Sequence, residues 1–227
     1  MKIVGMTSSL SRRRLLSRAV AAAGMGLLAT GAAATRAAAA AKPSGQAPPV
    51  LPTIGQQFTL SCIGFGATLV VDLPPPLPKL NFIGSRVVRV EVGGADFVRL
   101  RTVNFAMEAV HPLFGKVTLR LPDIDSSPDS LLQLTPNGLV ETWTQSMALT
   151  FSRSGDVEGP FSYESLEPGK WIANHILFPP PPQEMNPDGS STGGTKYVLQ
   201  APIKYGHDST EAAQLRGFDV NQGVILG

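Results

Sequence analysis

Cysteine and histidine are scarce in this 227-residue chain, which limits the chemistry that it can support. The single cysteine, Cys62, cannot form an internal disulfide, and the three histidines lie 32 or more residues apart. Metal sites in proteins usually show His or Cys ligands paired at short spacing. The sequence therefore gives no support for a zinc, haem, iron–sulfur or copper centre, and we expect no cofactor.

Motifs of nucleophilic and phosphate-binding enzymes are missing as well. The sequence contains no Gly-x-Ser-x-Gly elbow, and its Gly-Gly pairs do not match a phosphate-binding loop. His175 follows Trp171-Ile172-Ala173-Asn174, so aromatic and amide groups surround it, and it is the best candidate for a functional imidazole. A small secreted hydrolase or isomerase that pairs this histidine with a carboxylate is one alternative. The shortage of such groups favours a protein without catalytic activity.

Acidic residues gather in one short segment, where Asp123, Asp125 and Asp129 flank a pair of serines. Carboxylate oxygens are the ligands that Ca²⁺ prefers in extracellular modules. The segment lacks the glycine and the closing glutamate of an EF-hand loop. A solvated turn held by Asp side-chain hydrogen bonds is the competing interpretation.

Negative charge is absent from the first 71 residues, and this asymmetry changes the meaning of the net charge. Six of the 19 basic residues precede position 42, and none of the 17 acidic residues does. The remaining 13 basic and 17 acidic residues give residues 42–227 a net charge of −4. A basic surface for nucleic acid is therefore not expected in that part of the chain.

The N-terminal segment has the layout of an export signal. Ser11, Arg12 and Arg13 are followed by Leu15 and Leu16, and residues 19–34 are mostly alanine and glycine. This apolar stretch is shorter and less hydrophobic than the roughly 20 strongly apolar residues that cross a bilayer. The segment resembles twin-arginine signal peptides, whose pattern is Ser/Thr-Arg-Arg, any residue and then two apolar residues.

The resemblance implies a compartment and a partner for about the first 41 residues. The protein would meet an export translocase through its signal peptide, be cleaved after Ala41 and act in the cell envelope or outside the cell. No stable membrane span would remain after cleavage. A general secretory signal that contains an arginine pair by chance is the competing interpretation, and it leads to the same compartment.

Beyond the signal, the sequence predicts a flexible Pro-, Gly- and Gln-rich lead-in over 42–57 and one β domain over 58–227. Apolar residues there recur with period two, as in half-buried strands. Segments 86–92 and 97–110, separated by a Gly-Gly turn, predict a β-hairpin. Segments 131–134 and 139–152, joined by Thr135-Pro136-Asn137-Gly138, predict a second one. Further strands are expected over 58–65, 116–121, 171–178 and 196–205.

Helical signal is limited to one short turn, in which Ser209 or Thr210 would cap Glu211 to Leu215. The fold class is therefore all-β, an antiparallel β-sandwich or barrel with Pro/Gly-rich loops and little helix after the signal peptide.

These features indicate an exported bacterial protein with a binding or structural role outside the cytoplasmic membrane. Besides the enzyme above, two alternatives remain. One is an accessory subunit that is exported together with a redox enzyme, since the twin-arginine route carries folded and often cofactor-loaded proteins. The other is a barrel that carries an apolar small molecule.

Overall fold

A computed structural model describes residues 49–124, 127–175 and 177–225. Regular structure in this part of the chain is entirely β, which confirms the predicted fold class. Thirteen strands form one antiparallel sheet, and two short strands form a separate hairpin. This hairpin consists of β10 (Gln183–Met185) and β11 (Ser191–Gly193).

The large sheet closes on itself a first time because its end strand β14 also pairs with β1. We call this closed part the first ring. Its strands, in spatial order, are β1 (Gln57–Val70), β2 (Lys79–Gly93), β3 (Phe97–His111), β4 (Gly115–Arg120), β7 (Ala148–Ser154), β8 (Val157–Ser165), β13 (Ile203–His207) and β14 (Thr210–Arg216).

The sheet closes a second time because β5 at its other end pairs with β3. This second ring also contains β1, β2 and β3. Its other strands are β15 (Val220–Val224), β12 (Thr195–Leu199), β9 (Gly169–His175), β6 (Gly138–Gln145) and β5 (Ser130–Thr135). Closure of both rings leaves no strand of the large sheet without two neighbours, which removes the exposed edges that favour aggregation.

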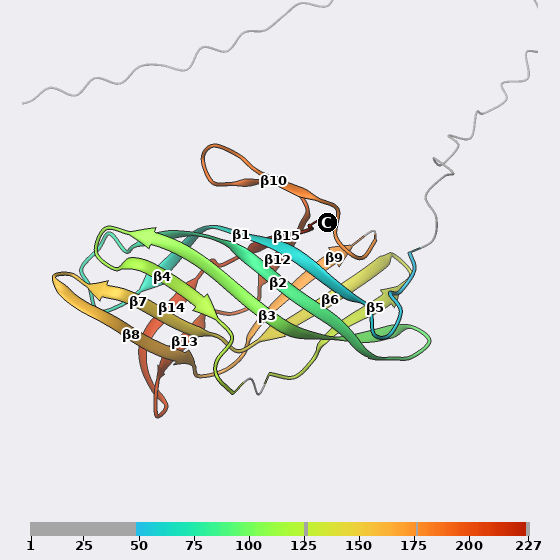
Figure 1. Cartoon of the computed structure of the whole chain (residues 1–227), viewed down its shortest axis with the longest axis horizontal. Coiled ribbons are helices and arrows are strands. Elements are labelled where there is room, and N and C mark those ends of the chain that lie inside the picture. The colour runs from blue at the N-terminus through green and yellow to red at the C-terminus, as the bar shows by residue number, and fades with distance from the viewer. Residues whose placement is uncertain (1–48, 125–126, 176, 226–227) are drawn as a thin grey trace, which may run out of the picture. The chain divides into compact units, whose positions relative to one another are not determined.

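The three shared strands are long enough to belong to both rings. The first half of β1 pairs with β15, whereas residues 68–70 at its end pair with β14. In the same way, β3 pairs with β5 through residues 97–100 and with β4 through residues 106–111. Register shifts between Gly64 and Ala67 and within 87–92 let these strands turn from one ring into the other. In Figure 1 the β7–β8 hairpin of the first ring lies at the left, and β5 and β6 lie at the right.

Two apolar clusters fill the domain. The larger one occupies the first ring and the adjoining part of the second, where Trp143 and Trp171 stack with centroids 4.1 Å apart. The smaller one lies at the far end of the second ring and contains Leu60, Val88, Val90, Val98, Leu100, Leu132, Leu139 and Phe178. Trp171 Nε1 also donates to the carbonyl of Phe218 over 2.8 Å, so its polar edge is satisfied inside the core.

Both predicted hairpins are present, but two predicted strands are broken. Segment 139–152 splits at Ser146 and Met147, because β6 pairs with β5 and β9 in the second ring while β7 pairs with β4 and β8 in the first. The apolar alternation continues across the break, so the sequence pattern alone does not reveal it. Segment 196–205 likewise divides into β12 and β13.

The predicted helical turn after Ser209 is wrong. Asp208 and Ser209 have φ values of 47° and 68° and form the two-residue turn between β13 and β14. Positive φ at both central residues matches a type I′ turn, the geometry that suits the twist of a tight hairpin. Ser209 is therefore a turn residue, and Thr210 begins a strand instead of a helix.

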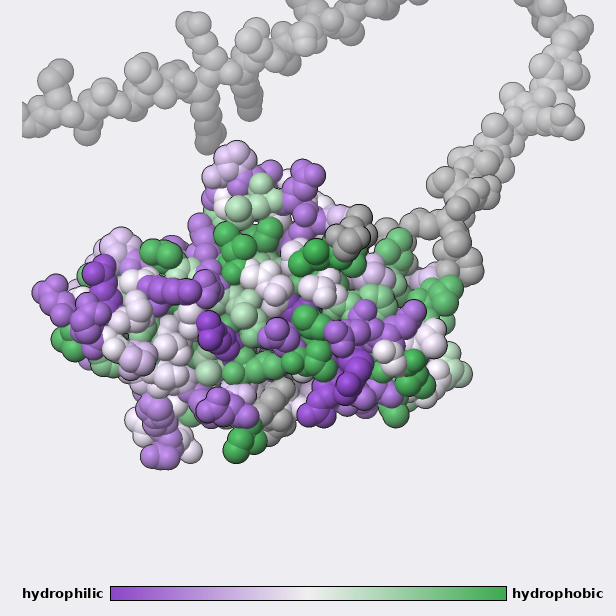
Figure 2. All heavy atoms as spheres, viewed as in Figure 1, coloured by the Kyte–Doolittle hydropathy of each residue, from purple (hydrophilic) through white to green (hydrophobic). Residues whose placement is uncertain are grey.

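The surface mixes polar and apolar side chains. Figure 2 shows hydrophilic and hydrophobic residues interspersed over the viewed face of the domain. Large exposed hydrophobic side chains are spread over β1, β2, β3, β8, β10, β12 and several loops. In the described part of the chain, no helix has the length and hydropathy needed to cross a membrane.

Candidate functional site

A buried polar centre lies inside the second ring, between the two apolar clusters. Arg86 of β2 is its hub, and its side chain is fully buried. The guanidinium donates from Nε to Thr102 Oγ1 (3.0 Å) and from Nη1 to Glu141 Oε1 (2.9 Å). Further donations reach Gln222 Oε1 (3.4 Å) and Ser130 Oγ (3.3 Å). The centre thus connects β2, β3, β5, β6 and β15.

The partners of Arg86 are fixed in turn. Tyr197 of β12 donates its hydroxyl to Glu141 Oε2 over 2.6 Å, and burial together with the negative charge of Glu141 raises the Tyr197 pKa well above its usual value. The guanidinium also lies 4.6 Å from the ring centroid of Trp143. Since Arg86, Glu141 and Tyr197 are all fully buried, the centre holds the ring together and does not face a substrate.

Cys62 points into the same interior and is a free thiol. Burial raises its pKa to about 12, an effect that the nearby Arg86 charge partly opposes. The thiol is therefore protonated at neutral pH and is not a nucleophile. Cys62 is therefore a buried structural residue.

An apolar pocket of about 290 Å³ opens at the hairpin end of the first ring. Four hairpin connections meet at this end, those between β1 and β2, β3 and β4, β7 and β8, and β13 and β14. Four of the ten lining residues are aromatic, four are aliphatic, and Asp72 and Ser154 are polar. The lining residues are Val71, Asp72, Leu73, Phe114, Phe151, Ser154, Phe161, Tyr163, Ala212 and Ala213.

Strand register explains why these side chains converge. Phe151 of β7 pairs with Phe161 of β8, and the next inward pair on that face includes Tyr163. Phe114 packs on Phe151 with ring centroids 5.0 Å apart. On the other side, a register shift in β14 lets Ala212 and Ala213 both line the pocket, and their small side chains leave the space open.

Tyr205 of β13 is fully buried in the first ring and does not line the pocket. Tyr205 pairs with Ala213 on one side and with Ser165 on the other. Its hydroxyl is buried and has no hydrogen-bond partner among the described residues. Burial raises the Tyr205 pKa far above its usual value, so the group remains a neutral donor at all ordinary pH values.

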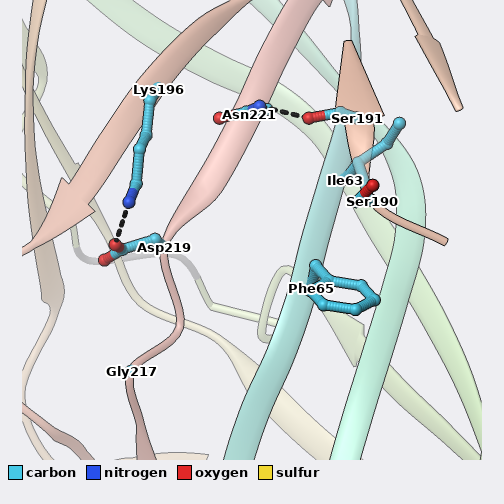
Figure 3. Close-up of a pocket in the computed structure, with 8 residues that line it drawn as sticks. All are labelled: Ile63, Phe65, Ser190, Ser191, Lys196, Gly217, Asp219 and Asn221. Atoms are coloured by element: carbon cyan, nitrogen blue, oxygen red, sulfur yellow. Dashed lines mark hydrogen bonds and ion pairs between the residues drawn. The ribbon is translucent and has the colours of Figure 1, made fainter. Parts of the chain in front are cut away.

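A second, more polar groove of about 260 Å³ lies between the β10–β11 hairpin and the outer face of the large sheet. In Figure 3, Phe65 and Ser190 lie on one side of it, and Lys196 and Asp219 lie on the other. Lys196 Nζ and Asp219 Oδ2 are 2.9 Å apart. The lining residues are Ile63, Phe65, Ser190, Ser191, Lys196, Gly217, Asp219 and Asn221.

The residues singled out in the sequence do not line either of these cavities. His175 ends β9 opposite Leu139, and its side chain lies outside the described part of the structure, as does Asp125. Asp123 is exposed, and Asp129 lies 4.0 Å from Arg101 in an ion pair. Among the described residues, no group of three His, Cys, Asp or Glu side chains is placed to hold a metal ion.

The signal-peptide residues Arg12, Arg13, Leu15, Leu16 and Ala41 also lie outside the described residues. Sequence reasoning missed the buried centre, although a signal for it existed. Arg86 has the same strand parity as the core residues Val88 and Val90, and Glu141 has that of Leu139 and Trp143. A charged residue on an otherwise apolar face, twice in one domain, indicates a buried ion pair.

Comparison with known proteins shows the fold but no family. No protein-family model matches the chain, and no curated protein sequence does. Among solved structures, DynF from the dynemicin biosynthesis pathway of Micromonospora chersina is similar, with a TM-score of 0.56 and 14% sequence identity. The match covers 83% of this chain and 88% of DynF. At this low identity the similarity shows a shared fold alone.

Proposed function

We propose that this protein is a non-catalytic binding protein whose ligand is a small apolar molecule. The observation that carries the proposal is the aromatic pocket at the hairpin end of the first ring. Ligand sites in closed β structures commonly lie at the mouth of the ring, and they combine a mostly apolar wall with a few polar groups. The pocket has this composition.

The size and polarity of the pocket limit the kinds of molecule that it can bind. Its volume of about 290 Å³ lies just below the usual range for ligand pockets, roughly 300–1,000 Å³. We therefore expect a molecule with one or two rings or a short chain. Four aromatic lining residues favour an unsaturated or aromatic body.

Filling the pocket with a larger side chain should weaken the binding of an apolar probe. In the Ala213→Phe protein, we expect affinity for the neutral fluorescent probe N-phenyl-1-naphthylamine to fall at least about tenfold, because the new ring occupies the ligand volume. Fluorescence titration of the full chain measures this change. The matched control is Ala201→Phe at an exposed loop position, which should bind the probe as the parent does.

Thermal unfolding of both variants would verify that they are folded. Equal probe affinity in the parent, Ala213→Phe and Ala201→Phe proteins would place the probe elsewhere and would overturn the proposed pocket.

The compartment is part of the proposal. We infer export by the twin-arginine route from Arg12, Arg13 and the apolar stretch that follows them. A domain with one buried cysteine and no disulfide needs no oxidising compartment in order to fold. This property suits a route that carries folded proteins out of the reducing cytoplasm.

A further inference from the structure

We propose that the groove shown in Figure 3 is a second binding site, and that its ligand is a neutral saccharide. The groove shares no lining residue with the apolar pocket. This inference therefore does not depend on the proposed apolar ligand, and either can fail alone.

The hairpin that forms one wall of the groove is firmly anchored. Gln183 at the start of β10 donates its amide to the carbonyl (3.0 Å) and hydroxyl (2.9 Å) of Ser61 and to the carbonyl of Asn221 (3.1 Å). The base of the hairpin also lies directly on β15, since a Cβ at Gly223 would be 2.7 Å from the Gln183 nitrogen. The wall is thus in place before a ligand arrives, which lowers the entropic cost of binding.

The tip of the same hairpin is also ordered. Asp188 Oδ1 accepts hydrogen bonds from the backbone N–H (2.9 Å) and the hydroxyl (2.6 Å) of Ser190, and these bonds lower the Asp188 pKa. Asn186 bonds to Ser190 through both backbone and side chain. A Cβ at Gly189 would lie 3.7 Å from the Phe65 ring, so the tip rests beside this ring and positions it.

Phe65 supplies an aromatic surface at the edge of the groove. Its side chain is 49% exposed and lies at the register shift of β1. Ile63, two residues earlier, also forms part of the lining. Covering the exposed part of the ring with a ligand would remove apolar area from water, which favours binding. The apolar C–H faces of a sugar ring can cover such a surface, while its hydroxyl groups point to the sides.

The polar groups of the groove suit hydroxyl groups rather than ions. Lys196 and Asp219 are the charged lining residues, and their charges cancel. Asp219 is held by the backbone N–H of Leu199, which donates to Oδ1 over 3.0 Å. A carboxylate acceptor next to an ammonium donor can bind two neighbouring hydroxyls at once, whereas an anion would meet repulsion from Asp219 and a cation from Lys196.

Asn221 and Ser191, which bond to each other, extend the polar side of the groove. A volume of about 260 Å³ accommodates little more than one sugar ring. The further rings of an oligosaccharide would extend along the protein surface. The combination of one aromatic face, a neutral donor–acceptor pair and a rigid wall is what points to a neutral saccharide.

Titration of the ¹⁵N-labelled full chain with maltotriose, cellotriose and N,N′,N″-triacetylchitotriose, followed by NMR, tests the site. We expect at least one of these sugars to shift the amide signals of residues around Phe65, Ser190 and Asp219 at millimolar concentration. Phe65→Ala and Asp219→Asn should each weaken that binding about tenfold, because they remove the ring surface and the anionic acceptor. Val110→Ala, an exposed apolar change outside the groove, should leave it unaltered.

Two results would overturn the inference. The first is the absence of groove shifts with all three saccharides. The second is a set of shifts caused by inorganic phosphate but by none of the sugars, which would make the groove an anion site. Binding of the fluorescent probe at the apolar pocket is measured separately. Loss of saccharide binding would therefore not be confused with loss of probe binding.

Discussion

Replacement of Glu141 by glutamine will lower the free energy of unfolding by about 3–5 kcal/mol. The change keeps the shape of the side chain but removes the negative charge that faces Arg86 at 2.9 Å. Both side chains are fully buried, so the guanidinium would keep its charge in a place that water does not reach. Urea unfolding, followed by the fluorescence of the stacked Trp143 and Trp171, measures the loss.

A surface ion pair on β2, the strand that carries Arg86, provides the matched control. Arg89 and Glu91 also form a close ion pair, at 2.6 Å, but their side chains are 48% and 31% exposed. Glu91→Gln should therefore change the free energy of unfolding by less than about 1 kcal/mol. If Glu91→Gln and Glu141→Gln destabilise the protein equally, burial of the Arg86 pair has no special role.

Removing both charges should be less harmful than removing one. The double variant Arg86→Met and Glu141→Leu leaves no unpaired charge, and replacement of a buried pair by apolar side chains is often neutral or stabilising. We expect this variant to recover most of the stability that Glu141→Gln loses. What it should lose is the set of hydrogen bonds that ties β2 to β3, β5 and β15.

Conversion of Arg12 and Arg13 to lysine will stop export and leave the precursor inside the cell. The twin-arginine resemblance requires arginine at both positions, and lysine keeps the positive charge while it removes the guanidinium. Cell fractionation and immunoblotting measure the distribution of precursor and mature chain. We expect an almost complete change from the exported to the retained form.

Conversion of Arg14 and Arg18 to lysine is the control, because these residues lie outside the Arg12-Arg13 pair and their charges are kept. Export of the Arg12/Arg13 variant at the parent rate would show that the general secretory route carries this protein. The predicted location outside the cytoplasmic membrane would then remain possible, but the predicted twin-arginine route would be wrong.

The strands were predictable because this fold depends on period-two burial. Val117 and Leu119 are buried and Arg120 is exposed, as alternation in a half-buried strand requires. The turns were predictable where Gly or Pro determine the backbone, as at Thr135 to Gly138, where the two ends of the turn pair. Strand turns made by Asp208 and Ser209 were missed because positive φ is uncommon for these residues.

Closure was not predictable from the pattern, since a sandwich and a closed ring bury the same alternating residues. The decisive contacts join β1 to β14 and β3 to β5, which are distant in sequence.

The pocket was missed for a related reason. Its wall combines Phe114, Phe151 and Ala213 from separate hairpins, and only the register brings them together.

Native mass spectrometry of the protein purified from the cells that produce it tests the apolar pocket most directly. We expect a complex heavier than the mature chain by one small molecule, which organic solvent extracts and which the Ala213→Phe protein lacks. Detection of the bare chain alone, or of the same bound molecule in the Ala213→Phe protein, would contradict the assignment of the pocket as the ligand site.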